Sequence, residues 1–234
     1  MTGQRWTDPN QGIGFFDDFN EILASGNRYT LTEGDVASSI AGAGDYEFGA
    51  VNLTAGTAAN DEATLALLEV PNARISQGNG RVWFEARLKL SSVTDGQMAM
   101  AIGLAQVGGA GANFIVDGTG EVSDVDFVGF SVDAGDGDAL RLVYNTAGGG
   151  GITEHSANAA TLAADTWFKV GIFFDGNTTL QFYHNGEPVG SAVDIAGTNF
   201  PDGEYLSVAV GAKSIAAAAH NLHVDWWAAL QEAA

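Results

Sequence analysis

Short runs of apolar residues recur along the chain, separated by clusters of Gly, Asn, Asp and Ser. Several runs alternate apolar and polar residues with a period of two, which is typical of strands that are buried on one side. Runs of this length bounded by turn residues predict an all-β protein with little helix. The clearest predicted strands are 81–90, 98–104, 127–132, 140–144, 168–174, 180–183 and 206–212.

The run RVWFEARLKL (81–90) shows what the alternation implies for one strand. One face carries Val, Phe, Ala, Leu and Leu and predicts a core face, whereas the other carries Trp83 among charged residues. Trp226 and Trp227 are adjacent and point to opposite sides of an extended segment. We therefore predict exposed aromatic contacts at Trp83 and Trp227; the alternative is a tryptophan half-covered by a loop.

Turn and helix signals complete the predicted organisation. The Asn185-Gly186 pair favours a tight type I′ hairpin. Helix signals are few, and we expect at most one short helical turn near 214–220 and another near 226–234. Because no linker or internal repeat occurs, we predict a single domain over residues 15–234. Residues 1–14 are predicted to be an N-terminal arm, either ordered or frayed.

Charge and composition narrow the range of partners. The 234-residue chain has a formal net charge of 9 − 29 = −20 and no cysteine. DNA, RNA and anionic membranes are poor partners, because Lys and Arg supply most of the affinity for phosphate groups. The lack of cysteine excludes thiol chemistry, disulfides and cysteine-ligated metals. The sequence shows neither a membrane-spanning apolar run nor a standard export signal, so we expect the protein to be made in the host cytoplasm.

Residues 165–192 carry the most characteristic order of motifs in the chain. Trp167 opens a strand, a Phe-Asp-Gly turn follows at 174–176, and the aromatic pair Phe182-Tyr183 leads into Asn185-Gly186. This order resembles the concanavalin A-like, laminin-G-like superfamily. The resemblance implies a two-sheet antiparallel jelly-roll sandwich.

Three further segments resemble a subset of that superfamily encoded among the structural genes of tailed phages. They are VNLTAGTAANDEATLALLEV (51–70), RVWFEARLKL (81–90) and DFVGFSVDAGDGDALRLVYNTAGG (126–149). The resemblance implies a capsid decoration, or cement, protein that binds the major capsid protein and strengthens contacts between capsomers, with a homotrimer favoured. The acidic surface suits the outer side of a virion, because the inner side would face packaged DNA.

Under that interpretation the N-terminal region contacts the capsid or a neighbouring subunit. The basic and aromatic residues expected to make this contact are Arg5, Trp6, Phe15 and Phe16. An arm that becomes ordered on docking adds contact area without a second domain.

No catalytic residues are predicted. Glycosidases on this jelly roll need a pair of carboxyl groups flanking the scissile bond. The nearest candidates are Glu121, Asp124 and Asp126, but Glu121 falls on the opposite parity and no second glutamate follows. A Gly-x-Ser-x-Gly elbow is also missing from the sequence, so we expect no hydrolase activity.

A glycine-rich acidic turn is the one candidate metal site. Asp133, Asp136 and Asp138 lie in the segment DAGDGD, and Ca²⁺ takes six to eight oxygen ligands. The alternative is a simple hairpin turn between Val132 and Leu140. No other cofactor is predicted.

A lectin-like, carbohydrate-binding module is the alternative to the decoration protein. In that function an outward tryptophan would stack on a sugar ring. On a virion it would attach the particle to host glycans.

Overall fold

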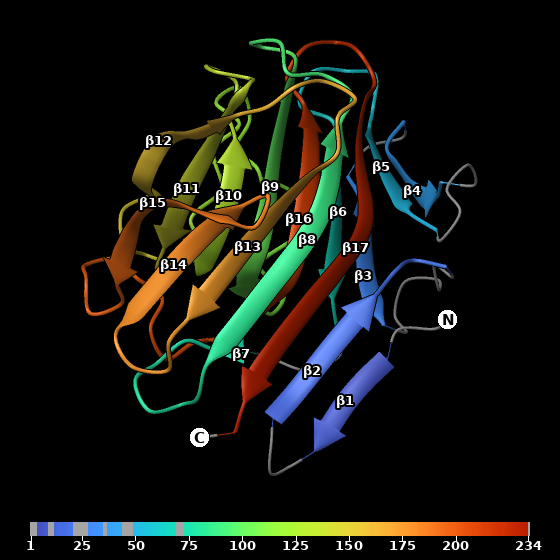
Figure 1. Ribbon diagram of the computed structural model, residues 1–234. Helices are drawn as coiled ribbons and strands as arrows, with labels where there is room; N and C mark the ends of the chain where they lie inside the picture. The colour runs from blue at the N-terminus through green and yellow to red at the C-terminus, as the bar shows by residue number, and fades with distance from the viewer. Residues whose placement is uncertain are drawn as a thin grey trace.

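The computed structural model describes residues 4–8, 12–20, 28–34, 37–43, 49–68 and 73–233. Within these ranges the chain forms strands and no helix (Figure 1). None of the described elements is therefore a helix of the length and apolarity that crossing a membrane requires. The strands are β1 (Gln4–Asp8), β2 (Gly12–Asp17), β3 (Tyr29–Glu33), β4 (Ser39–Gly42), β5 (Val51–Ala55), β6 (Glu62–Leu67), β7 (Ala73–Arg74), β8 (Val82–Leu90), β9 (Met98–Gln106), β10 (Phe127–Val132), β11 (Ala139–Asn145), β12 (Thr153–Thr161), β13 (Phe168–Phe174), β14 (Thr179–His184), β15 (Glu187–Asp194), β16 (Tyr205–Ser214) and β17 (His220–Glu232).

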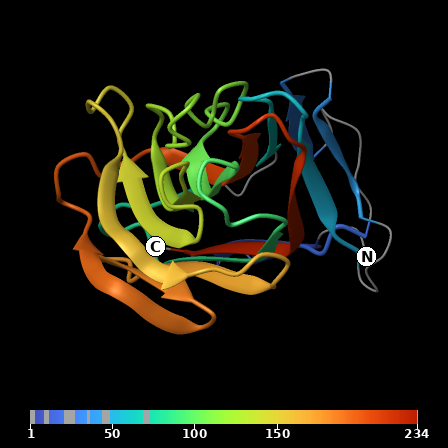
Figure 2. The same cartoon turned by 90° about the horizontal axis from the view of Figure 1, so that it is seen from above.

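The strands form two antiparallel sheets that pack face to face (Figures 1 and 2). The nine-stranded sheet has the order β1-β2-β17-β8-β13-β14-β15, with β5 paired to β17 and β4 paired to β5. The eight-stranded sheet has the order β12-β11-β10-β9-β16-β6-β3, with β7 paired to β16. The predicted all-β, two-sheet antiparallel sandwich is confirmed.

A single large core lies between the sheets, and the alternation in the sequence explains it. In β8 the burial pattern alternates along all nine residues, with Val82, Phe84, Ala86 and Leu88 fully buried. Facing strands contribute inward residues in the same way, such as Phe182 and Phe130, whose rings meet edge to face at 5.3 Å. The side chains that alternate with these inward residues along each strand point to the outer faces of the sandwich.

A long connection covers the outward face of the eight-stranded sheet. Residues 107–126, here called the covering segment, pack Phe114, Ile115 and Val122 against small residues of that sheet, including Ala101 and Ala209. This packing forms a second, smaller core on the outside of the sheet. Among the described residues, no comparable segment covers the outward face of the nine-stranded sheet over its central strands.

The predicted N-terminal arm is part of the nine-stranded sheet in the residues that the structure describes. β1 pairs with β2, and β2 pairs with β17, from Gly12 opposite Glu232 to Asp17 opposite Trp227. The predicted boundary between the arm and the domain, at residue 15, falls inside β2. Residues on both sides of it pair with β17 in one hydrogen-bonded ladder. Residues 1–3 and 9–11 of the predicted arm lie outside the described part of the chain.

Local signals were correct at the hairpin and wrong at the two helical turns. Asn185 and Gly186 have φ values of 51° and 85°, as a type I′ turn between β14 and β15 requires. The segments 214–220 and 226–233, in contrast, contain no helix. The second segment belongs to β17, where pairing with both β8 and β2 overrides its helix propensity.

Candidate functional site

Aromatic side chains gather on the outward face of the nine-stranded sheet, which faces the viewer in Figure 1. Trp83 of β8 lies between Phe173 of β13 and Tyr183 of β14, with ring centroids 5.8 and 5.6 Å away. Farther along the sheet, Phe16 and Trp226 meet at 6.3 Å. These five residues are called the aromatic face below.

Two ion pairs frame Trp83 along β8. Arg81 precedes it by two residues and makes a two-pronged contact with Glu232, with N–O distances of 2.6 and 2.7 Å. Hydrogen bonding to Glu232 raises the pKa of Arg81 above its ordinary value. Glu85 follows Trp83 by two residues and pairs with Lys169 at 3.4 Å. Residues two apart in an extended chain share a face, so hydrogen-bonding groups precede and follow Trp83 on its own side of the sheet.

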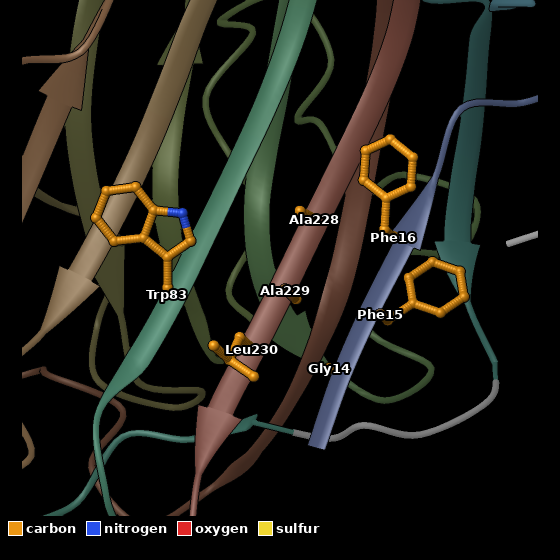
Figure 3. Close-up of a pocket in the computed structure, with 7 residues that line it drawn as sticks. All are labelled: Gly14, Phe15, Phe16, Trp83, Ala228, Ala229 and Leu230. Carbon is orange, nitrogen blue, oxygen red and sulfur yellow. The ribbon is translucent and has the colours of Figure 1, made fainter. Parts of the chain in front are cut away.

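An open apolar hollow of about 250 Å³ adjoins Trp83. Figure 3 shows the indole of Trp83 on one side and the phenyl ring of Phe16 on the other, with Leu230 between their strands. Phe16 and Leu230 are each 40% exposed. The lining atoms are almost all carbon. The lining residues are Gly14, Phe15, Phe16, Trp83, Ala228, Ala229 and Leu230.

The prediction that Trp227 is exposed is wrong. Its side chain is fully buried against Phe19 and Tyr29, at ring distances of 5.1 and 5.8 Å. The cause is a bulge in the pairing of β17 with β8 between Val224 and Trp226, which shifts the inward parity of the strand by one residue. Trp226 consequently points outward, a position that alternation from Val224 would have placed in the core.

A third tryptophan on the outward side of this sheet, Trp167, is not among the contact residues that the sequence predicts. The guanidinium of Arg87 lies 4.7 Å from the ring centre of Trp167, and Arg87 also pairs with Asp225 at 2.5 Å. The alternation in β8 places Arg87 on the outward face, which is the sequence signal for a contact there. That Arg87 pairs with Asp225 of β17 depends on the bulge and could not be read from the sequence.

The three central strands beneath the aromatic face carry no net charge, although the chain as a whole is strongly acidic. The charged residues of β8, β13 and β17 are three bases and three acids, so their formal charges sum to zero, whereas the chain carries −20. The central strands of this sheet are therefore free of the net negative charge found on the chain as a whole. The six residues are Arg87, Lys89, Lys169, Glu85, Asp225 and Glu232.

The residues predicted for capsid contact differ in their exposure in the structure. Phe16 is exposed on the aromatic face, but Phe15 is only 4% exposed, so its prediction as a contact residue is wrong. Successive residues of β2 alternate sides, and Phe15 takes the core side opposite Ala229. Arg5 and Trp6 lie in β1, and their side chains are outside the described part of the structure.

The acidic turn does not assemble the predicted calcium site. Asp133 is buried, pairs with Arg141 at 2.9 Å, and accepts hydrogen bonds from the backbone N–H groups of Gly135 and Asp136. A hydrogen bond with Asp138 raises the pKa of Asp136. No cluster of three or more histidine, aspartate or glutamate side chains suited to a metal occurs in the described ranges. Asp133 thus stabilises its own turn, as expected for the alternative of a hairpin turn.

The carboxylates considered for hydrolysis stabilise a loop. Asp124 accepts hydrogen bonds from the side-chain amide of Asn145 and the backbone N–H of Gly148. Asp126 accepts one from the backbone N–H of Ala147. Both side chains therefore hold the connection between β11 and β12.

Comparisons with known proteins identify the class of fold. No protein-family model and no curated protein sequence matches the chain. A protein of unknown function from Shewanella oneidensis MR-1 superposes with a TM-score of 0.64 at 15% identity, over 100% of this chain and 90% of the other. An endo-β-1,4-glucuronan lyase from Trichoderma reesei gives 0.63 at 13%, covering 92% and 94%. The carbohydrate recognition domain of Emp47p gives 0.62 at 12%, covering 97% of each chain.

These likenesses confirm a concanavalin A-like fold, as the sequence predicted. The fold is shared by lectins and by enzymes that act on carbohydrate. At such low identity they establish the fold alone, so function has to be argued from the site.

Proposed function

We propose that the protein binds carbohydrate on the aromatic face, with the indole of Trp83 as the stacking platform. One observation carries this proposal: the ring of Trp83 is seen face-on above the sheet in Figure 3. The pairs Arg81–Glu232 and Lys169–Glu85 flank Trp83 in the sequence, two residues before it and two residues after it. A sugar ring has an apolar C–H face and a rim of hydroxyl groups. The indole would bury that face, and the charged groups would bond to the rim.

The charge distribution supports a neutral glycan as the ligand. The three central strands have no net charge, so desolvating them brings no unbalanced charge into the interface. The remaining surface is acidic and would repel a polyanionic chain. The likeness to a carbohydrate recognition domain supports carbohydrate as the ligand. We propose binding without turnover, because the acidic residues near β10 are engaged in loop structure.

A glycan array followed by calorimetry tests the proposal. The wild type should bind at least one neutral glycan, and Trp83→Ala should weaken that binding at least tenfold. Tyr205→Ala is the matched control, since Tyr205 is an aromatic residue 60% exposed on the other sheet, in β16. An array without any ligand, or an equal loss in both variants, would contradict the proposal.

A capsid decoration subunit is the second candidate. The observation that favours it is the neutral aromatic face, because protein interfaces are depleted in charge and enriched in aromatic residues at their centre. Its partner would be the major capsid protein on the outer virion surface, and a homotrimer is the expected assembly. Undecorated capsids mixed with the protein should bind it at fixed stoichiometry, and Phe16→Glu should weaken this binding.

A further inference from the structure

The hollow beside Trp83 has a chemistry different from that of the platform itself. We propose that it takes an apolar substituent, an alkyl, acyl or aryl group, of a glycan whose sugar ring stacks on Trp83. This inference rests on the proposed function and specifies which glycans are preferred.

The hollow exists because small and large residues alternate along the outward faces of β2 and β17, beside Trp83 of β8. Leu230 of β17 stands between Gly14 of β2 and Trp83 of β8 in the register, and Ala228 stands opposite Phe16. Gly14 and Ala228 are too short to fill the space between their large neighbours. The result is a depression whose floor is backbone and Cβ atoms and whose walls are Trp83, Phe16 and Leu230.

The lining excludes a polar occupant. A hydroxyl group entering the hollow would give up hydrogen bonds to water and find almost no acceptor or donor in exchange. An apolar group has no such cost and gains from leaving water. The volume of about 250 Å³ exceeds the roughly 150 Å³ cavity that holds benzene, so a hexyl or phenyl group fits.

Continuity with the platform argues for a substituent of a bound glycan. Trp83 is partly buried, forms a wall of the hollow and turns its ring face outward in Figure 3, so a sugar stacked there lies directly beside the opening. A second copy of the chain is a poorer occupant. Stable protein interfaces bury about 1,200 Å² or more in total, whereas the hollow is one small depression lined by seven residues.

Alkyl glycosides provide the test. Methyl and hexyl β-D-glucopyranoside are titrated by calorimetry, and the indole Nε1–H resonance of Trp83 is followed by NMR. A buried methylene contributes about 0.8 kcal/mol, or about a fourfold gain in affinity. Burial of two or more methylenes predicts that the hexyl glycoside binds more than tenfold tighter than the methyl glycoside.

Two variants separate the hollow from the platform. Ala228→Phe fills the hollow, so the ratio of the affinities for the hexyl and the methyl glycoside should fall to about one. Ala192→Phe is the matched control, because Ala192 is an exposed strand residue on β15, far along the same sheet. It should leave both affinities as in the wild type.

Several results would overturn the inference. Equal affinities for the two glycosides, or a hexyl advantage that survives in Ala228→Phe, would show that the chain does not enter the hollow. A dimer in sedimentation velocity that Ala228→Phe dissociates would identify a second copy as the occupant. If hexanol bound as tightly as hexyl glucoside and Trp83→Ala had no effect, the hollow would bind alkyl chains without a sugar stacked on Trp83. The array of unsubstituted glycans tests the proposed function independently of all three.

Discussion

The ammonium group of Lys213 and the carboxylate of Glu62 form an ion pair at 3.0 Å, with side chains only 0% and 4% exposed. Lys213 also donates hydrogen bonds to the backbone carbonyl of Ile115 and, at 2.6 Å, to Asp117. Glu62 accepts one from the backbone N–H of Ile115 at 3.2 Å. Burial raises the pKa of Glu62. Together these contacts fasten the covering segment to the eight-stranded sheet.

Removing the lysine should destabilise the protein strongly. Lys213→Met leaves the carboxylate of Glu62 buried without its counter-charge, and we expect a loss of about 3–5 kcal/mol in the free energy of unfolding. The double replacement Lys213→Met with Glu62→Leu should recover much of that loss, because both charges are gone. Urea unfolding curves check this, and a double variant less stable than Lys213→Met would contradict it.

Truncating Trp227 should mainly lower stability, whereas truncating Trp83 should mainly weaken glycan binding. Trp227→Ala empties a fully buried site between Phe19 and Tyr29, so we expect a loss of about 3–5 kcal/mol in stability. Trp83 points to the outward face, so Trp83→Ala should cost much less stability while weakening glycan binding at least tenfold. Thermal unfolding and calorimetric titration of both variants check the contrast. Comparable stability losses in the two would contradict it.

The stability should depend on pH through His220. Burial lowers the pKa of this side chain, so the folded protein holds it neutral where the unfolded chain takes up a proton. The contribution of the neutral His220 side chain to the free energy of unfolding is therefore fully present above about pH 6.5. It is lost as the pH falls from there through the lowered pKa of the folded state.

Melting temperatures between pH 7.5 and 5 test this dependence. His220→Gln should show a smaller decrease than the wild type over that range. A residual slope is expected, because burial also lowers the pKa values of His184 and His223. A variant whose melting temperature falls more steeply than that of the wild type would show that the sign is wrong.

Gly129 should not tolerate a side chain. A Cβ atom there would lie 2.3 Å from the carbonyl oxygen of Ile102 and 2.6 Å from Cζ of Phe127. We expect Gly129→Ala to cost about 1–3 kcal/mol in the free energy of unfolding, as overpacked sites do. Gly111→Ala is the control, since a Cβ atom at Gly111 meets nothing within 4 Å. Denaturant unfolding of the pair checks the difference.

The alternation in β8 and the Asn185-Gly186 turn were sufficient to predict the class of fold, because both depend on local chemistry. Trp227 could not be placed in the same way. Its orientation depends on a bulge two residues earlier, which arises from the pairing of β17 with β8 and leaves no mark in the apolar pattern.

The candidate site was predictable only in part. Trp83 was identified correctly as facing away from the core, since one strand's alternation is enough to show it. The hollow needs Gly14 and Ala228 at diagonal positions of the neighbouring strands β2 and β17, and these residues come from opposite ends of the chain. Only the register of β2 against β17 brings them together, so inspection of either segment alone does not reveal it.

The uneven distribution of charge has a practical consequence. A molecule with a charge of −20 and one neutral face will adsorb to a positively charged surface through its acidic sides, leaving the neutral face turned away. Immobilisation on an anion-exchange support should therefore orient the molecules uniformly, with Trp83 accessible to the solution and without a chemical tag.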